Sequence, residues 1–165
     1  MMKILSRTLL FLYFFILIWV LFFKLRFNIS STLDEHRRSL NFVPFAAPTI
    51  INGEVSYGEA VWNFLFFIPF GMLLSVNFKR IRFLPKLLLM VAFSFVVEMI
   101  QYVFAIGATD ITDLITNTAG GLLGLILYNL LNRFIEDKIL DKIIVYSGIV
   151  LLALFFIMRM RITLR

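Results

Sequence analysis

Residues 84–131 read LPKLLLMVAFSFVVEMIQYVFAIGATDITDLITNTAGGLLGLILYNLL, and this stretch decides the fold. It holds two apolar runs of the length that crosses a bilayer as a helix, about 20 residues each, joined by a short polar loop. Carboxylic acids and amides interrupt the apolar sequence. Because an ionisable side chain at membrane depth costs about 2.5–3.5 kcal/mol to insert, such groups usually face a cavity or a partner. We therefore expect the two helices to pair and to aim their polar groups at one place.

The composition of the whole chain is that of an integral membrane protein. Of its 165 residues, 61% are hydrophobic and 20 are Phe, whereas a soluble domain is about 45–50% apolar. The chain has no cysteine, which excludes disulfides and thiolate chemistry, and its single histidine, His36, excludes a histidine-rich metal site. The net charge of +6 comes from basic clusters at the ends of apolar runs, which is typical of membrane proteins and does not suggest nucleic-acid binding.

Apolar runs predict an all-α fold, a polytopic bundle of about five transmembrane helices. The expected spans are Ile4–Phe23, Ala60–Phe78, Leu84–Ile106, Leu114–Leu131 and Ile143–Met158. The first resembles a signal peptide in its flanking charges, but its apolar run is long and no small-residue cleavage site follows, so we interpret it as a retained anchor. The only sizeable loop is Lys24–Glu59, where Pro and aromatic residues predict some order and a short interfacial helix is an option.

Basic residues near the span ends predict the orientation. The loop between the second and third spans is strongly basic, whereas the loop between the third and fourth spans holds Asp110 and Asp113 and no base. Since cytoplasmic loops carry the excess of Lys and Arg, the Asp110 loop is expected on the extracytoplasmic side. The total number of Lys and Arg residues differs little between the two sides, and the arginines near the C-terminus argue against this orientation.

The third span carries Ser94, Glu98 and Gln101 at spacings of four and three residues, which place them on one helical face, with Tyr102 beside them. Two interpretations are open. The cluster is structural, with Glu98 protonated or hydrogen-bonded to a neighbouring helix, or Glu98 is a carboxylate that lines a polar cavity.

The fourth span begins with acids and continues with small residues. Asp110 and Asp113 suit a helix N-terminus through capping and the helix dipole, but Asn117 lies a turn inside an apolar run. Asp113, Asn117, Gly120 and Gly124 share one stripe, and the two glycines allow two helix backbones to approach closely. We expect the partner of this stripe to be the Glu98 face of the third span.

The second span contributes Asn63, Pro69 and Gly71. A proline inside a helix removes one backbone hydrogen bond, so we expect a kink or local unwinding between Leu65 and Pro69. This feature is either a packing device or a means of opening room for a ligand beside Asn63.

Charged residues leave further options open. In the first loop, Arg37 and Arg38 can pair with the acids, bind a phosphate or contact lipid headgroups. Glu98, Asp110 and Asp113 can act as general acid and base or hold Mg²⁺ or Mn²⁺, although the sequence defines no metal site. It points to no particular cofactor.

Four motifs in order resemble the VanZ-like family. They are Arg38-x-x-Asn41-x-x-Pro44-Phe45, Asn63-x-x-x-Phe67-x-Pro69-x-Gly71, Ser94-x-x-x-Glu98-x-x-Gln101 and Asp110-x-x-Asp113-x-x-x-Asn117-x-x-Gly120. The resemblance divides the chain, as one membrane domain, into an N-terminal anchor with the start of the loop (1–36), a VanZ-like core (37–128) and a C-terminal loop with the last span (129–165). Many relatives carry Gly-Arg just before the first Asp, where this chain has Gly107-Ala108-Thr109, so a contact from that arginine is lost or replaced here.

The resemblance implies a multi-pass protein of the bacterial plasma membrane with a role at the cell envelope. The family takes its name from a protein associated with resistance to teicoplanin, a lipoglycopeptide antibiotic. The first hypothesis is a non-enzymatic protein that binds a lipid-linked cell-wall precursor, the lipoglycopeptide or another lipidated envelope ligand in a groove open to the outer leaflet. The alternatives are an intramembrane enzyme, carboxylate- or metal-dependent, acting on a lipid phosphate or ester, and a transporter. Membrane lipids are expected partners in each case, and the sequence leaves the oligomeric state open.

Overall fold

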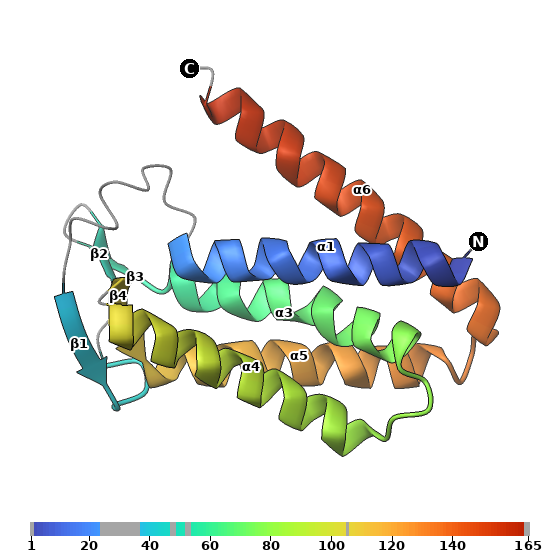
Figure 1. The fold of residues 1–165 in the computed structure, drawn as a ribbon, viewed down its shortest axis with the longest axis horizontal. Helices are drawn as coiled ribbons and strands as arrows, with labels where there is room; N and C mark the ends of the chain where they lie inside the picture. Colours follow the sequence, from blue (N-terminus) through green and yellow to red (C-terminus); the bar gives the residue numbers. More distant parts are fainter. Residues whose placement is uncertain (1, 24–36, 47–48, 52–53, 105, 164–165) are drawn as a thin grey trace.

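Five helices dominate the chain in a computed structural model, which describes residues 2–23, 37–46, 49–51, 54–104 and 106–163. They are α1 (Met2–Phe23), α3 (Gly58–Asn77), α4 (Phe83–Phe104), α5 (Ile111–Leu131) and α6 (Asp137–Thr163). All five are long and apolar enough to cross a membrane, which confirms the predicted helical bundle. α1, α3, α4 and α5 run lengthwise together, and α6 departs from them at a steep angle (Figure 1).

The predicted spans match the helices closely except at the last one. α6 begins at Asp137, well before the expected Ile143, and continues to Thr163. The apolar run underestimates this helix because its first turns are polar, and acidic residues such as Asp137 stabilise a helix N-terminus.

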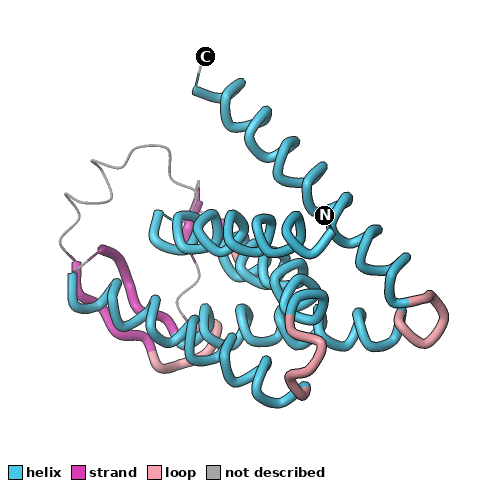
Figure 2. The backbone as a smooth tube through the Cα atoms, turned by 45° about the vertical axis from the view of Figure 1, so that its right-hand side comes forward, coloured by secondary structure: helices cyan, strands magenta, loops and turns pink. Residues whose placement is uncertain are grey.

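Short strands, which the sequence did not predict, form in the described part of the first loop (Figure 2). The optional interfacial helix was expected in the loop as a whole, of which residues 24–36 lie outside the described residues. β1 (Arg37–Asn41) pairs in parallel with β4 (Ile106–Asp110), and β2 (Thr49–Ile51) pairs antiparallel with β3 (Glu54–Ser56). The β1–β4 pair matches Asn41 with Asp110, so the first loop is attached directly to the start of α5.

The glycine stripe packs closely, but against a different helix from the one we expected. A Cβ atom on Gly120 would collide with the carbonyl oxygen of Phe64, and one on Gly124 with that of Ile68. Both carbonyls belong to α3, so the prediction that these glycines face α4 is wrong. The neighbouring glycine, Gly121, is the one that meets α4, through Met90. The glycine-rich surface of α5 thus contacts α3 and α4 at once. Residue spacing along α5 shows which glycines share a face, but it does not show which of the two helices that face contacts.

Pro69 does not unwind its helix. α3 is continuous from Gly58 to Asn77, so of the predicted kink or local unwinding the unwinding is wrong, and the kink stays a prediction. In the turn before the proline, the Tyr13 hydroxyl donates a hydrogen bond of 2.7 Å to the carbonyl oxygen of Phe66. The carbonyl that loses its donor to Pro69 is that of Leu65, so the Tyr13 bond joins α1 to α3 and does not replace the missing helix bond.

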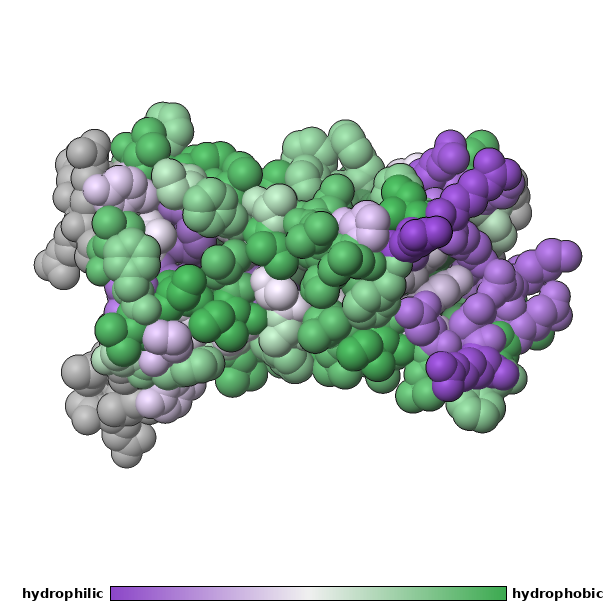
Figure 3. All heavy atoms as spheres, turned by 90° about the horizontal axis from the view of Figure 1, so that it is seen from below, coloured by the Kyte–Doolittle hydropathy of each residue, from purple (hydrophilic) through white to green (hydrophobic). Residues whose placement is uncertain are grey.

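An aromatic cluster fills the middle of the bundle. The rings of Phe67, Phe70 and Phe93 lie about 6 Å apart, centroid to centroid, and Phe14 lies 4.9 Å from Phe93. Apolar side chains cover the waist of the outer surface, whereas hydrophilic ones gather at the end that holds the N-terminus and the α3–α4 turn (Figure 3). This distribution suits a protein surrounded by lipid.

Candidate functional site

The predicted polar residues gather at the other end of the bundle, where β4 leads into α5. Asp110 is the junction, because it ends β4 and is the N-cap of α5. One carboxylate oxygen accepts the backbone N–H of Thr112 at 2.7 Å, and the other accepts the side-chain amide of Asn41 at 3.1 Å. The backbone N–H of Asp110 itself donates to the Glu98 carboxylate at 3.1 Å. A single residue therefore connects β1, α4 and α5.

Glu98 is almost fully inside the protein, with 6% of its surface exposed. Its carboxylate accepts the Asp110 N–H, and its backbone carbonyl accepts a hydrogen bond of 3.1 Å from the Thr109 hydroxyl. A hydrogen bond to a carboxylate is worth about 1.5–3 kcal/mol, so the bond from the Asp110 N–H offsets part of the cost of burying the acid. Together with the bond from Thr109 to the backbone carbonyl, it fixes the position of β4 against the end of α4.

Asp113 joins α5 to α3. Its carboxylate accepts a hydrogen bond of 2.8 Å from the side-chain amide of Asn63, and only 5% of its surface is exposed. The pairing explains why the second span carries a polar residue one turn inside its apolar run.

Ser94, Gln101 and Asn117 lie deeper and use only part of their hydrogen-bonding capacity. Asn117 donates to the Ser94 hydroxyl at 2.9 Å, and Gln101 donates to the carbonyl of Leu21 at 3.0 Å. The two side-chain oxygens, Asn117 Oδ1 and Gln101 Oε1, are fully buried and have no donor within the described part of the chain. A buried acceptor in this condition suits a water molecule or a ligand that carries a donor.

A cavity of about 40 Å³ lies beside Glu98 and Asp113, between α1, α3, α4 and α5. Its polar lining is Glu59, Asn63, Glu98 and Asp113, and its apolar lining is Val20, Leu21 and Trp62. It has room for about three water molecules. Three carboxyl groups thus meet apolar walls near one end of the bundle.

Glu59 is a site residue that the sequence analysis missed. It precedes Asn63 by four residues, so both lie on one face of α3. That spacing was the signal available, but Glu59 sat at the edge of the predicted loop and was assigned to it.

Other predicted residues are placed less directly. The backbone of Arg38 lies in β1 opposite Gly107, and the side chains of Arg37 and Arg38 are outside the described residues. Pro69, Gly71, Gly120 and Gly124 do not line the cavity, and the three glycines pack the α3–α5 contact. Among the residues that the structure describes, no three His, Cys, Asp or Glu side chains are arranged to hold a metal ion.

Comparison with known proteins identifies the family. The model of the VanZ/LLP1 family matches residues 10–132 of this chain. The chain belongs to the VanZ/LLP1 family. Among curated proteins, Protein VanZ of Enterococcus faecium is 52% identical to it over 157 residues, which are 95% of this chain and 94% of that protein. No solved structure matches it.

The VanZ/LLP1 match covers the whole candidate site. It begins in α1, includes both segments of the β1–β4 pair and ends just after α5, so α6 lies beyond it. Every residue of the cavity lining falls within the match. The site therefore lies within the region that the VanZ/LLP1 model matches, as do the glycines that pack α3 against α5.

Proposed function

We propose that this protein acts at the cell envelope by binding a lipid-linked or lipidated ligand at the Glu98–Asp113 cavity, and that this binding raises tolerance to teicoplanin. The observation that carries the proposal is the convergence of Asn63, Glu98 and Asp113 on one small cavity with apolar walls. Ligand sites are mostly apolar, with a few polar groups that orient the ligand. An amphipathic ligand matches that combination.

The dimensions of the cavity restrict how such a ligand binds. At about 40 Å³ it admits only a small polar group, so the body of the ligand would lie outside it, along the helices. Trp62 is half exposed at the cavity and offers an amphipathic ring of the kind that occurs at membrane interfaces. The ligand's apolar part would remain in the lipid.

The first test replaces Glu98, Asp113 and Asn117 singly by alanine in a strain that lacks the protein. We expect wild type to raise the minimal inhibitory concentration of teicoplanin and each variant to lose most of that increase, because Glu98 and Asp113 line the cavity and Asn117 is a buried polar group that bonds Ser94 on the same helix as Glu98. Membrane insertion is measured in parallel. The control is Glu136→Ala, which removes an exposed acid from the turn between α5 and α6.

Two results would contradict the proposal. If wild type does not alter teicoplanin tolerance, the association of the family with teicoplanin resistance does not extend to this protein. If the three variants insert normally and protect as well as wild type, the polar cluster is structural.

An intramembrane enzyme is the second candidate, because Glu59, Glu98 and Asp113 line the same cavity. Glu98→Gln separates the two candidates, since glutamine retains the shape and most of the hydrogen bonding. Binding predicts that this variant keeps partial protection. General acid–base catalysis predicts nearly complete loss, because a proton-transferring group contributes about 10²–10⁴-fold to a rate.

We also propose that the Asp110 end of the bundle is extracytoplasmic, as the basic α3–α4 loop predicts. The natural absence of cysteine makes the test direct. Ala46→Cys, an exposed position after β1, should react with a membrane-impermeant maleimide in intact cells. Phe134, whose surface is 80% exposed, lies in the α5–α6 turn. The variant Phe134→Cys should react with the maleimide only after the cells are permeabilised. The reverse labelling pattern would show that the Asp110 end of the bundle is cytoplasmic.

A further inference from the structure

A second cavity lies at the opposite end of the bundle from the Glu98 site. It measures about 680 Å³ and is enclosed by the first turns of α1, the end of α3 with the turn that follows it, and the start of α6. Its lining holds five basic and two acidic side chains, an excess of three positive charges. They are Lys3, Arg7, Lys79, Arg80 and Lys138, with Asp137 and Asp141.

The two acids are committed to one of the five bases. The Lys79 ammonium lies 2.7 Å from the Asp141 carboxylate and 3.1 Å from the Asp137 carboxylate, and Tyr128 donates a hydrogen bond to Asp141. Partial burial by itself would lower the pKa of Lys79, but the two carboxylates outweigh it and raise the pKa above its usual value. Lys79, Asp137 and Asp141 therefore form an ionic link between the α3–α4 turn and α6.

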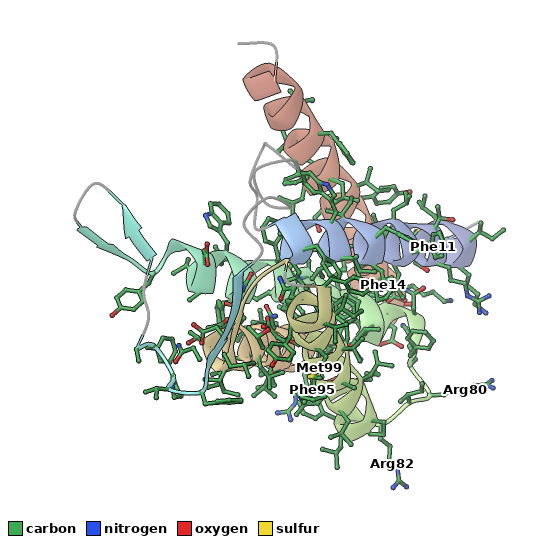
Figure 4. The ribbon with its side chains drawn as sticks, turned by 60° about the vertical axis from the view of Figure 1, so that its left-hand side comes forward. Phe11, Phe14, Arg80, Arg82, Phe95 and Met99 are labelled. Carbon is green, nitrogen blue, oxygen red and sulfur yellow. The ribbon has the colours of Figure 1, made fainter. Side chains whose placement is uncertain are left out.

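The other four bases have no acidic partner within the described residues. Lys3, Arg7 and Lys138 are exposed, and Arg80 extends outward from the α3–α4 turn (Figure 4). Arg82 projects from the same turn but does not line the cavity. The cavity therefore contains an uncompensated positive field.

The rest of the lining combines a fixed polar edge with apolar walls. Ser6 donates to the side-chain oxygen of Asn77 at 3.1 Å, while the Asn77 amide donates to the carbonyls of Ser6 at 3.2 Å and Leu73 at 2.9 Å. These bonds hold α1 against the end of α3. The apolar wall is supplied by Met2, Val76, Phe78, Ile81 and Val145.

We infer that this cavity binds the phosphate headgroup of an anionic membrane lipid. The four uncommitted bases supply the attraction for a phosphodiester, and basic pockets between transmembrane helices bind such headgroups. The apolar wall favours a lipid over a free anion, because the glycerol and the first acyl carbons need an apolar contact beside the phosphate. The site is separate from the proposed function and does not depend on it.

The test uses full-length protein in detergent, titrated with phosphatidylglycerol, phosphatidylcholine or inorganic phosphate and followed by native mass spectrometry. Wild type should prefer phosphatidylglycerol. The triple variant Arg7→Gln/Arg80→Gln/Lys138→Gln should bind it about tenfold more weakly, because it removes three of the four bases that line the cavity without an acidic partner in the described part of the chain. If that protein does not accumulate, the double variant Arg80→Gln/Lys138→Gln, at exposed positions, gives the same reading.

A matched control separates a site from general surface charge. Arg82→Gln/Arg133→Gln/Lys142→Gln removes the same charge from exposed positions that do not line the cavity. It should bind phosphatidylglycerol as wild type does. The inference is overturned if the control weakens binding as much as the cavity variant, if the cavity variant binds normally, or if inorganic phosphate binds as well as the lipid.

Discussion

Gly124→Ala is expected to separate α3 from α5 and to lower sharply the amount of folded protein in the membrane. The added Cβ would overlap the carbonyl oxygen of Ile68, which belongs to the rigid backbone of α3 and has no rotamer that moves it aside. Inserting a methyl group into a packed interior costs about 1–3 kcal/mol, and more when backbone must move. Helix association in lipid depends largely on such close packing, and the single hydrogen bond between Asn63 and Asp113 does not replace it along the rest of the α3–α5 contact.

Gly148→Ala is the matched control for this change. Its new Cβ would lie 3.0 Å from the Cδ2 atom of Leu9, the end of a flexible side chain that can rotate away. Accumulation in membranes and the temperature of unfolding in detergent measure both variants. Equal stability of the two proteins would show that the α3–α5 contact does not control folding.

Asp110→Ala is expected to have the second largest effect, because it removes two hydrogen bonds at once. Loss of a helix N-cap costs about 0.5–2 kcal/mol, and the bond from Asn41 is lost with it. Asp110→Asn has one side-chain oxygen, which can still accept the Thr112 N–H, but its amide nitrogen cannot accept the hydrogen bond from Asn41. The temperature of unfolding should therefore fall in the order wild type, Asp110→Asn, Asp110→Ala.

Asn41→Ala provides the comparison for this series, since it removes the bond between β1 and Asp110 together with the exposed bond of 3.1 Å that the Asn41 side-chain oxygen accepts from the Val43 N–H, and leaves the cap of α5 intact. We expect it to resemble Asp110→Asn in stability. If Asp110→Ala were no less stable than Asp110→Asn, the capping bond to Thr112 would have no energetic role. Teicoplanin tolerance, measured on the same variants, would then show separately whether attachment of β1 matters for the proposed function.

The sequence predicted those parts of the fold that depend on local composition. Apolar runs of bilayer length located the five helices, and helical spacing placed Ser94 and Glu98 on one face. The expected proximity of the third and fourth spans is present in the bond between Ser94 and Asn117. These inferences succeed because one helix and one short loop determine them.

Features that depend on distant segments were missed. Asn41 and Asp110 are 69 residues apart in the chain, and β1 alone is too short to indicate that it pairs with β4. The partner of Gly124 was assigned to α4 because that helix is next in sequence, whereas three-dimensional packing brought α3 to it. Periodicity shows which residues share a face, but it does not say which helix covers that face.

The parallel β1–β4 pair also sets an order of events during biosynthesis. The ribosome makes Asn41 69 residues before Asp110, and chains grow at roughly 5–20 residues per second, so several seconds separate the two halves of this contact. β1 cannot dock until α4 has entered the bilayer and the following segment has emerged on the same side. The polar end of the bundle is thus completed only after membrane integration of its third span, and a chain arrested before that point contains the α1 and α3 walls of the cavity without its α5 wall.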